Sequence, residues 1–103
     1  MLVSIKSVWK NGKTEYSPAR LHDKSELSAL IRGIVDGSQP VCTPPEVTVW
    51  YYGYKLVYNP TIRRYIVYGE NDNGTTYKSC GAALNKLKAF YLQSVSFGDT
   101  IKL

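Results

Sequence analysis

Apolar and polar residues alternate with a period of two in the first nine residues of the chain. Val3, Ile5 and Trp9 fall on one side, and Ser4 and Lys6 fall on the other. This alternation is typical of a β-strand with one buried face. The sequence therefore predicts a strand over residues 2–9.

A turn and a short return strand are predicted next. Asn11-Gly12 is the preferred pair for a type I′ turn, in which both central residues need a positive φ. Residues 14–16 can then pair with the first strand. Pro18 either ends this second strand or confines it to the edge of a sheet, because proline has no N–H to donate.

The clearest helical pattern lies between residues 23 and 37. Asp23 is placed to cap the N-terminus of the helix, and Glu26 three residues later can complete a capping box. Gly37 is a natural C-terminal stop. The apolar residues recur at three- and four-residue spacings and form one stripe, which comprises Leu27, Leu30, Ile31, Ile34 and Val35.

Strand patterns dominate the middle of the chain. Apolar and aromatic residues alternate with other residues over 46–58, and Gly53 within this run indicates a bulge or a bend. The elements predicted after it are a turn at 59–61, a strand at 62–68, a second turn at 69–74 and a short strand at 75–77.

A second helix is predicted over roughly residues 80–93. Ser79 can cap it, and its apolar face comprises Ala83, Leu84, Leu87, Phe90 and Tyr91. From Val95 onwards apolar residues alternate weakly, which predicts a last edge strand.

Together these elements predict one α+β domain over residues 1–103. Their order is β-β-α-β-β-β-α-β, with a mainly antiparallel sheet of four to six strands and two helices packed on it, most simply on one face. The length of 103 residues agrees, because it leaves room for a single hydrophobic core.

The charge distribution adds a basic side to this picture. Thirteen Lys and Arg residues stand against eight Asp and Glu, and no acid occurs in residues 47–69 or 74–97. Such a side suits a polyanion or an acidic protein surface, although the same charge also keeps a small protein soluble. The sequence has no apolar run of membrane-spanning length and no signal-peptide pattern, so a cytoplasmic protein without a membrane partner is expected.

Aromatic residues cluster beside these basic residues. Six of the nine tyrosines fall in residues 51–68. Aromatic rings stack on unpaired bases, and interleaved cations hold phosphates. The leading hypothesis is a non-catalytic module whose sheet surface contacts nucleic acid or a nucleoprotein. Its candidate binding residues are Trp50, Tyr52, Tyr54, Lys55, Arg63, Arg64, Tyr65, Lys78, Lys86 and Lys88.

Two other interpretations of these residues stay open. Tyrosine and tryptophan favour strands, so many of them can be core residues or cross-strand partners. They also dominate protein–protein hot spots, together with arginine. The second functional hypothesis is therefore a small accessory protein, of the kind that viruses encode, which inhibits a host complex by protein–protein binding.

The order α-β-β-β-α across residues 24–93 resembles that of the double-stranded-RNA-binding domain. It is similar in the same way to small DNA-binding domains that lay a three-stranded sheet in the major groove. The lysine cluster that opens the second helix of the RNA-binding family is represented in the segment 78–83 by Lys78 alone. The resemblance implies a nucleic-acid partner, but it assigns no family.

A third hypothesis is an enzyme with Cys80 as its nucleophile. Cys80 would lie in the first turn of the second helix, where the helix dipole favours a thiolate, and His22 is the only histidine that can act as its base. The alternative is that Cys80 is a small buried residue. Cys42 and Cys80 lack the spacing of a metal site, and we expect no metal, no cofactor and no catalytic activity.

Overall fold

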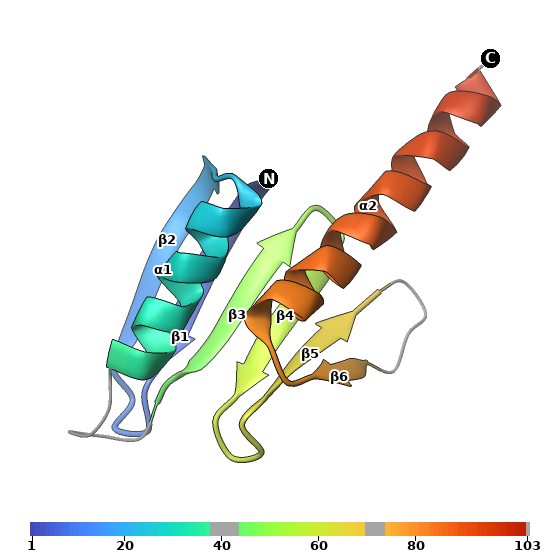
Figure 1. The fold of residues 1–103 in the computed structure, drawn as a ribbon. Coiled ribbons are helices and arrows are strands. Elements are labelled where there is room, and N and C mark those ends of the chain that lie inside the picture. The colour runs from blue at the N-terminus through green and yellow to red at the C-terminus, as the bar shows by residue number, and fades with distance from the viewer. Residues whose placement is uncertain (38–43, 70–73, 103) are drawn as a thin grey trace.

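A computed structural model describes residues 1–37, 44–69 and 74–102 of the chain, with side chains as far as Leu92 (Figure 1). The strands are β1 (Leu2–Val8), β2 (Thr14–Leu21), β3 (Glu46–Tyr51), β4 (Tyr54–Asn59), β5 (Arg64–Tyr68) and β6 (Thr75–Tyr77), and the helices are α1 (Lys24–Gly37) and α2 (Cys80–Lys102). Within the described residues, the six strands form one antiparallel sheet in the order β2-β1-β3-β4-β5-β6. The predicted α+β class is confirmed.

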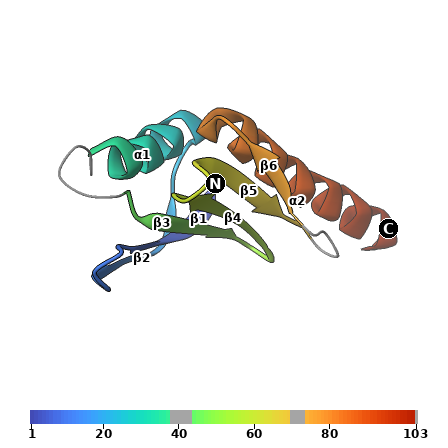
Figure 2. The ribbon, with the colours of Figure 1, turned by 90° about the horizontal axis from the view of Figure 1, so that it is seen from below.

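Both helices lie on the same face of the sheet, as Figure 2 shows. The core is the layer between the two helices and the sheet. The alternation in the strands and the apolar stripes on the helices direct its side chains into this layer. Its fully buried members include Val3 from β1, Val47 and Val49 from β3, Leu56 from β4, Val67 from β5, Leu27 and Ile31 from α1, and Leu84 and Leu87 from α2.

The predicted helix starts are confirmed by their capping hydrogen bonds. The Glu26 N–H donates to Asp23 Oδ1 over 3.3 Å, and the Ala82 N–H donates to Ser79 Oγ over 3.2 Å. The prediction for the apolar stripe of α1 needs one correction. Leu30 keeps 41% of its surface exposed, because it lies beside a cleft toward β2, where α1 does not cover the sheet.

The segment 46–58 is two strands, so the predicted bulge or bend at Gly53 is wrong. Tyr51 pairs with Tyr54, and Tyr52 and Gly53 form the turn between β3 and β4. Tyr52 takes a φ of 58°, which a tyrosine rarely adopts. The centroids of the Tyr52 and Tyr91 rings lie 4.3 Å apart, and the two rings are nearly parallel. This stacking packs the turn against the middle of α2.

The first hairpin also differs from the predicted type I′ turn. The Gly12 N–H donates to the Trp9 carbonyl, which makes Lys10 and Asn11 the central residues. Only Gly12 has a positive φ in this turn. Further along β2, Pro18 and Ala19 lie opposite a single residue of β1, which is a bulge on an edge strand. The prediction that Pro18 belongs to an edge is confirmed.

The predicted last strand is wrong, because α2 continues to Lys102 and runs past the end of the sheet (Figure 1). Weak alternation does not outweigh the hydrogen bonds that an existing helix gains with each added residue. Cys42 and most of the predicted turn at 69–74 lie outside the described residues.

Candidate nucleic-acid interface

The face of the sheet opposite α1 and α2, here called the open face, is covered by no described element (Figure 2). Alternation sends every second strand residue to it, and none of these side chains is fully buried. The open face carries Ser4, Lys6 and Val8 from β1, Glu46, Thr48 and Trp50 from β3, Lys55, Val57 and Asn59 from β4, and Arg64, Ile66 and Tyr68 from β5.

One row across the open face brings two aromatic rings and a cation together. Trp50 pairs with Lys55, and Lys55 pairs with Tyr68, so the three side chains are cross-strand neighbours. The ammonium of Lys55 lies 5.0 Å from the centroid of the Tyr68 ring. With strands about 4.8 Å apart, the row spans about 10 Å. Flat rings with a cation between them can stack on bases and hold a phosphate.

The backbone of Gly74 helps to fix the end of this row. Gly74 has a φ of +97°, and a Cβ at this position would lie 2.8 Å from the Tyr68 ring and 2.9 Å from the Ile66 side chain. Only glycine allows the chain to come so close to Tyr68 in this conformation. The position of the Tyr68 ring therefore depends on the start of β6.

A second row runs parallel to the first, two residues further along the strands. Lys6 pairs with Tyr16 on one side and with Thr48 on the other. Val57 and Ile66 continue the row as half-buried apolar residues. The open face thus combines rings, cations and an apolar centre.

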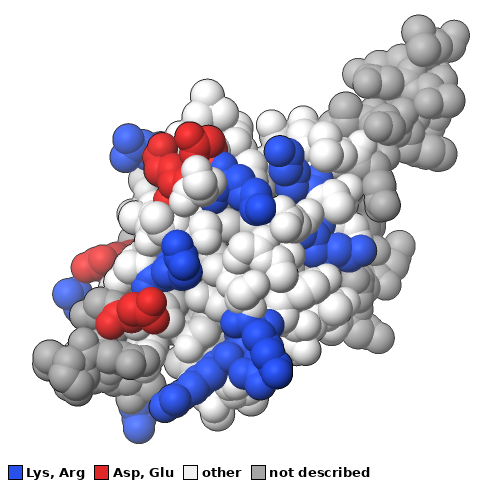
Figure 3. Space-filling view, viewed as in Figure 1, with Lys and Arg blue, Asp and Glu red and all other residues white. Residues whose placement is uncertain are grey.

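The electrostatics of the open face are basic. Among the described residues it carries Lys6, Lys55 and Arg64, and its one acid is Glu46 at the start of β3. On the helix-covered side of the sheet, acidic side chains gather around α1, whereas the charged side chains visible around α2 are all Lys or Arg (Figure 3). Three cations against one acid on the open face favour an anionic partner there.

Three of the predicted binding residues lie on the open face, namely Trp50, Lys55 and Arg64. Trp50 and Lys55 are cross-strand neighbours, whereas Arg64 lies opposite Asn59 at the other end of β5. Arg63 precedes Arg64 in the turn between β4 and β5, where it is exposed and has a φ of 54°. The two arginines are therefore not equivalent.

The predicted tyrosines lie elsewhere. Tyr52 forms the turn described above, and Tyr54 stacks on Phe90 of α2 with ring centroids 5.6 Å apart. Tyr65 is a core residue with 7% of its surface exposed, and its ring lies 4.9 Å from that of Tyr58. Burial raises the pKa of its hydroxyl. The structure thus places Tyr65 where a ligand on the open face cannot reach it.

Lys78 is exposed in the segment that joins β6 to α2. Lys86 and Lys88 belong to α2 and therefore lie on the helix side of the sheet, where Lys88 is exposed and the Lys86 ammonium lies 4.7 Å from the centroid of the Phe90 ring. These two lysines of α2 do not contribute to the open face. Any binding role for them needs a ligand that reaches around the molecule.

Sequence reasoning missed Lys6, Tyr16 and Tyr68. Tyr68 lies four residues after Arg64 in β5, so alternation places both side chains on the same face, and the sequence alone could have indicated this. Alternation already placed Lys6 opposite Val3 and Ile5. The position of Lys6 and its partner Tyr16 beside the strand of Trp50 could not be predicted, because it depends on β1 pairing with β3, which lies about 40 residues further along the chain.

The residues proposed for an enzyme are not joined by a hydrogen bond. Cys80 is buried, and burial raises the pKa of its thiol, although the Ser28 hydroxyl and the charge of Arg32 act in the opposite direction. His22 Nδ1 lies 3.0 Å from Glu26 Oε1, on the side of α1 that faces β2. A protonated, buried thiol is a poor nucleophile.

Among the described residues, no group of three or more His, Cys, Asp or Glu side chains is placed to hold a metal ion. No helix in this part of the chain is both long and apolar enough to cross a membrane.

Comparison of the chain with protein-family models, with curated protein sequences and with solved structures finds no match. The resemblance in element order therefore brings no family with it. The functional argument depends on the chemistry of the open face.

Proposed function

We propose that this protein is a non-catalytic module that binds single-stranded nucleic acid on the open face of its sheet. The observation that carries this proposal is the row Trp50–Lys55–Tyr68, which lies on a face that no described element covers. Two rings and a cation side by side suit a stacked base next to a phosphate. Lys6 lies one side-chain row away from these three residues and Arg64 lies two rows away, and both can contact further phosphates.

The geometry favours single strands over duplexes. Bases in a duplex are stacked on each other, so their faces are not available to a protein ring. The rings of Trp50 and Tyr68 stand on a sheet, where unpaired bases can lie flat against them. A duplex could contact these cations only through its phosphates.

The first test is a fluorescence anisotropy titration with labelled single-stranded DNA and RNA at 50 and 200 mM salt. Three phosphate contacts, one for each cation of the open face, would weaken binding roughly 20-fold between these two concentrations. A matching duplex should bind more weakly than either single strand. Failure to bind any single strand at 50 mM salt would contradict the proposal.

Variants then locate the site. We expect Trp50→Ala to cost about 1–3 kcal/mol of binding free energy for a stacked base. Lys55→Gln should lower the slope of log affinity against log salt by about 0.7. Lys88→Gln is the matched control, because Lys88 is equally charged but exposed on the helix side. Equal losses for Lys55→Gln and Lys88→Gln would indicate unspecific charge attraction and would exclude the open face as the site.

A protein partner with an acidic surface is the second candidate for the same face. The observation that favours it is the exposed apolar edge beside Lys6, where Leu2, Tyr16 and Leu21 are exposed. In that case the protein would act as an inhibitory accessory protein of the kind that viruses encode, and Trp50→Ala would still weaken binding. The protein would then bind no oligonucleotide in the titration above.

A further inference from the structure

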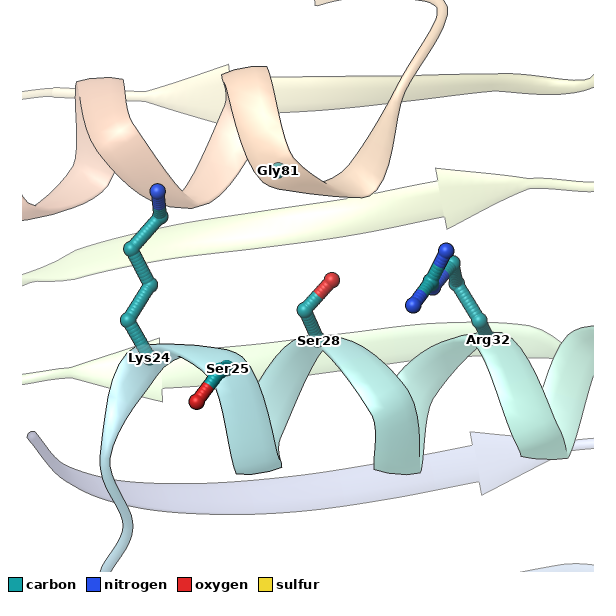
Figure 4. Close-up of a pocket in the computed structure, with 5 residues that line it drawn as sticks. All are labelled: Lys24, Ser25, Ser28, Arg32 and Gly81. Carbon is teal, nitrogen blue, oxygen red and sulfur yellow. The ribbon is translucent and has the colours of Figure 1, made fainter.

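A second candidate site lies on the other side of the sheet, between α1 and the first turn of α2 (Figure 4). It is an open cleft with a volume of about 440 Å³. Its lining residues are Lys24, Ser25, Ser28, Arg32 and Gly81. The open face does not contribute to it, so the two sites are independent.

The pattern of α1 builds one wall of the cleft. Lys24, Ser28 and Arg32 are spaced by four residues, which places them on one stripe of a helix. Figure 4 shows all three side chains directed toward α2, whereas Ser25 is turned away. The stripe is about 12 Å long between its first and last Cα atoms. The two cations therefore stand at the ends of the cleft, with a hydroxyl between them.

Lys24 and Arg32 form no ion pair within 4 Å among the described residues, and no acid lines the cleft. Of the acids of α1, Glu26 pairs with His22, and Asp36 lies one turn beyond Arg32 on the same stripe; neither lines the cleft. Two like charges that face one space repel each other, and a dianion between them would remove that repulsion.

Ser28 supplies a neutral donor at the centre of the stripe. It is half-buried and hydrogen-bonds with the Cys80 side chain beneath it. The Ser28 O–H donates to the Cys80 sulfur and so lowers the pKa of the thiol, and rotation of the hydroxyl can redirect this donor to an anion in the cleft. The donors of the cleft are then an ammonium, a hydroxyl and a guanidinium.

Gly81 forms the opposite wall and keeps the cleft open. A Cβ at Gly81 would meet no atom within 4 Å, so the space in front of it is empty. Its φ is not in the left-handed region, so other residues fit the backbone here. Glycine costs an α-helix about 1 kcal/mol relative to alanine, and in this position it leaves the space that a ligand needs.

We propose that this cleft binds a diphosphate group. A single phosphoryl group that contacts Arg32 and Ser28 lies toward one end of the stripe, and Lys24 stands at the other end. A second phosphoryl group extends the anion toward Lys24. Arginine holds phosphate oxygens in pairs, and lysine acts as a point charge on the second group.

The test uses inorganic pyrophosphate as the probe, with orthophosphate as the comparison, and follows backbone amide signals by NMR at low salt. We expect pyrophosphate to shift the signals of Ser28 and Gly81 and to bind at least fivefold more tightly than orthophosphate. Arg32→Gln and Lys24→Gln should each lower the affinity for pyrophosphate at least fivefold. Equal affinity for both anions, or no binding of pyrophosphate, would overturn the proposal.

Two variants separate the cleft from general effects. Gly81→Glu adds an acid to the wall of the cleft at a position where a Cβ meets no atom within 4 Å, so it should abolish pyrophosphate binding while the unfolding midpoint stays the same or rises. Lys88→Gln should leave binding unchanged, and an effect as large as that of Arg32→Gln would overturn the assignment. Trp50→Ala should also leave it unchanged, because the cleft does not depend on the open face.

Discussion

Tyr65 and Tyr68 lie three residues apart in β5 and project from opposite faces of the sheet. Tyr65 is 93% buried, with 7% of its surface exposed, and packs against the Tyr58 ring. Tyr68 is half-exposed under the Lys55 ammonium. Replacing each by alanine should therefore separate the stability of the fold from binding on the open face.

The two substitutions should differ in size as well as in kind. Removing a buried aromatic ring costs about 3–5 kcal/mol, and the ring pair with Tyr58 belongs to that loss. Domains of this size are stable by about 5–15 kcal/mol, so Tyr65→Ala loses a large share of the total. Tyr68→Ala should cost about 1 kcal/mol or less of stability. It should weaken single-strand binding by about 1–3 kcal/mol, which is roughly 5- to 150-fold.

Urea denaturation followed by tryptophan fluorescence measures the first quantity, and the anisotropy titration measures the second. Tyr65→Phe serves as the control for the buried site, because it keeps the ring and should stay folded with wild-type affinity. The reasoning is refuted if Tyr68→Ala binds as tightly as the wild type. It is equally refuted if Tyr65→Ala loses less than about 1 kcal/mol, since Tyr65 would then not be a core residue.

Three further predictions concern the turn after β4, the stripe of α1 and the buried thiol. Arg63→Gly should stabilise the protein by about 1 kcal/mol in urea denaturation, because Arg63 has a φ of 54°, whereas Arg64→Ala should lower the salt slope of binding by about 0.7. Leu27→Ala should cost about 2–5 kcal/mol and Leu30→Ala about 1 kcal/mol, because Leu30 is already 41% exposed; equal losses in denaturation would contradict the placement of α1. Burial raises the pKa of the Cys80 thiol in the folded state, so its contribution to stability is complete below about pH 8.5 and is lost as the pH rises further. Between pH 7 and pH 10, the free energy of unfolding measured by denaturation should therefore fall less for Cys80→Ala than for the wild type.

Local patterns in the sequence predicted most of the fold. The caps at Asp23 and Ser79, the two apolar stripes and the alternation of the strands depend on neighbouring residues, which the sequence displays directly. The turn at Tyr52 was not predictable in the same way, because tyrosine disfavours the positive φ that it adopts. Its conformation is held by stacking on Tyr91, a contact about 40 residues away in the chain.

The candidate site was predictable only in part, because alternation assigns residues to two faces without saying which face the helices cover. Trp50, Lys55 and Arg64 share the open face, whereas Tyr65 lies on the face of β5 that points into the core. The tail from Val95 onwards was predicted as a strand from weak alternation, and the backbone is helical there. The cleft between α1 and α2 depends on how two helices lie beside each other, which no single segment displays.

The central claim is that nucleic acid binds to the open face, and amide NMR mapping with a short single-stranded oligonucleotide tests it most directly. The account predicts that the largest shifts fall on Lys6, Trp50, Lys55, Arg64 and Tyr68, with side-chain contacts from the bases to the rings of Trp50 and Tyr68. The amides of α1 and of α2 up to Leu92 should shift little. Shifts that concentrate on α1 and α2 while the open face stays unchanged would contradict the claim.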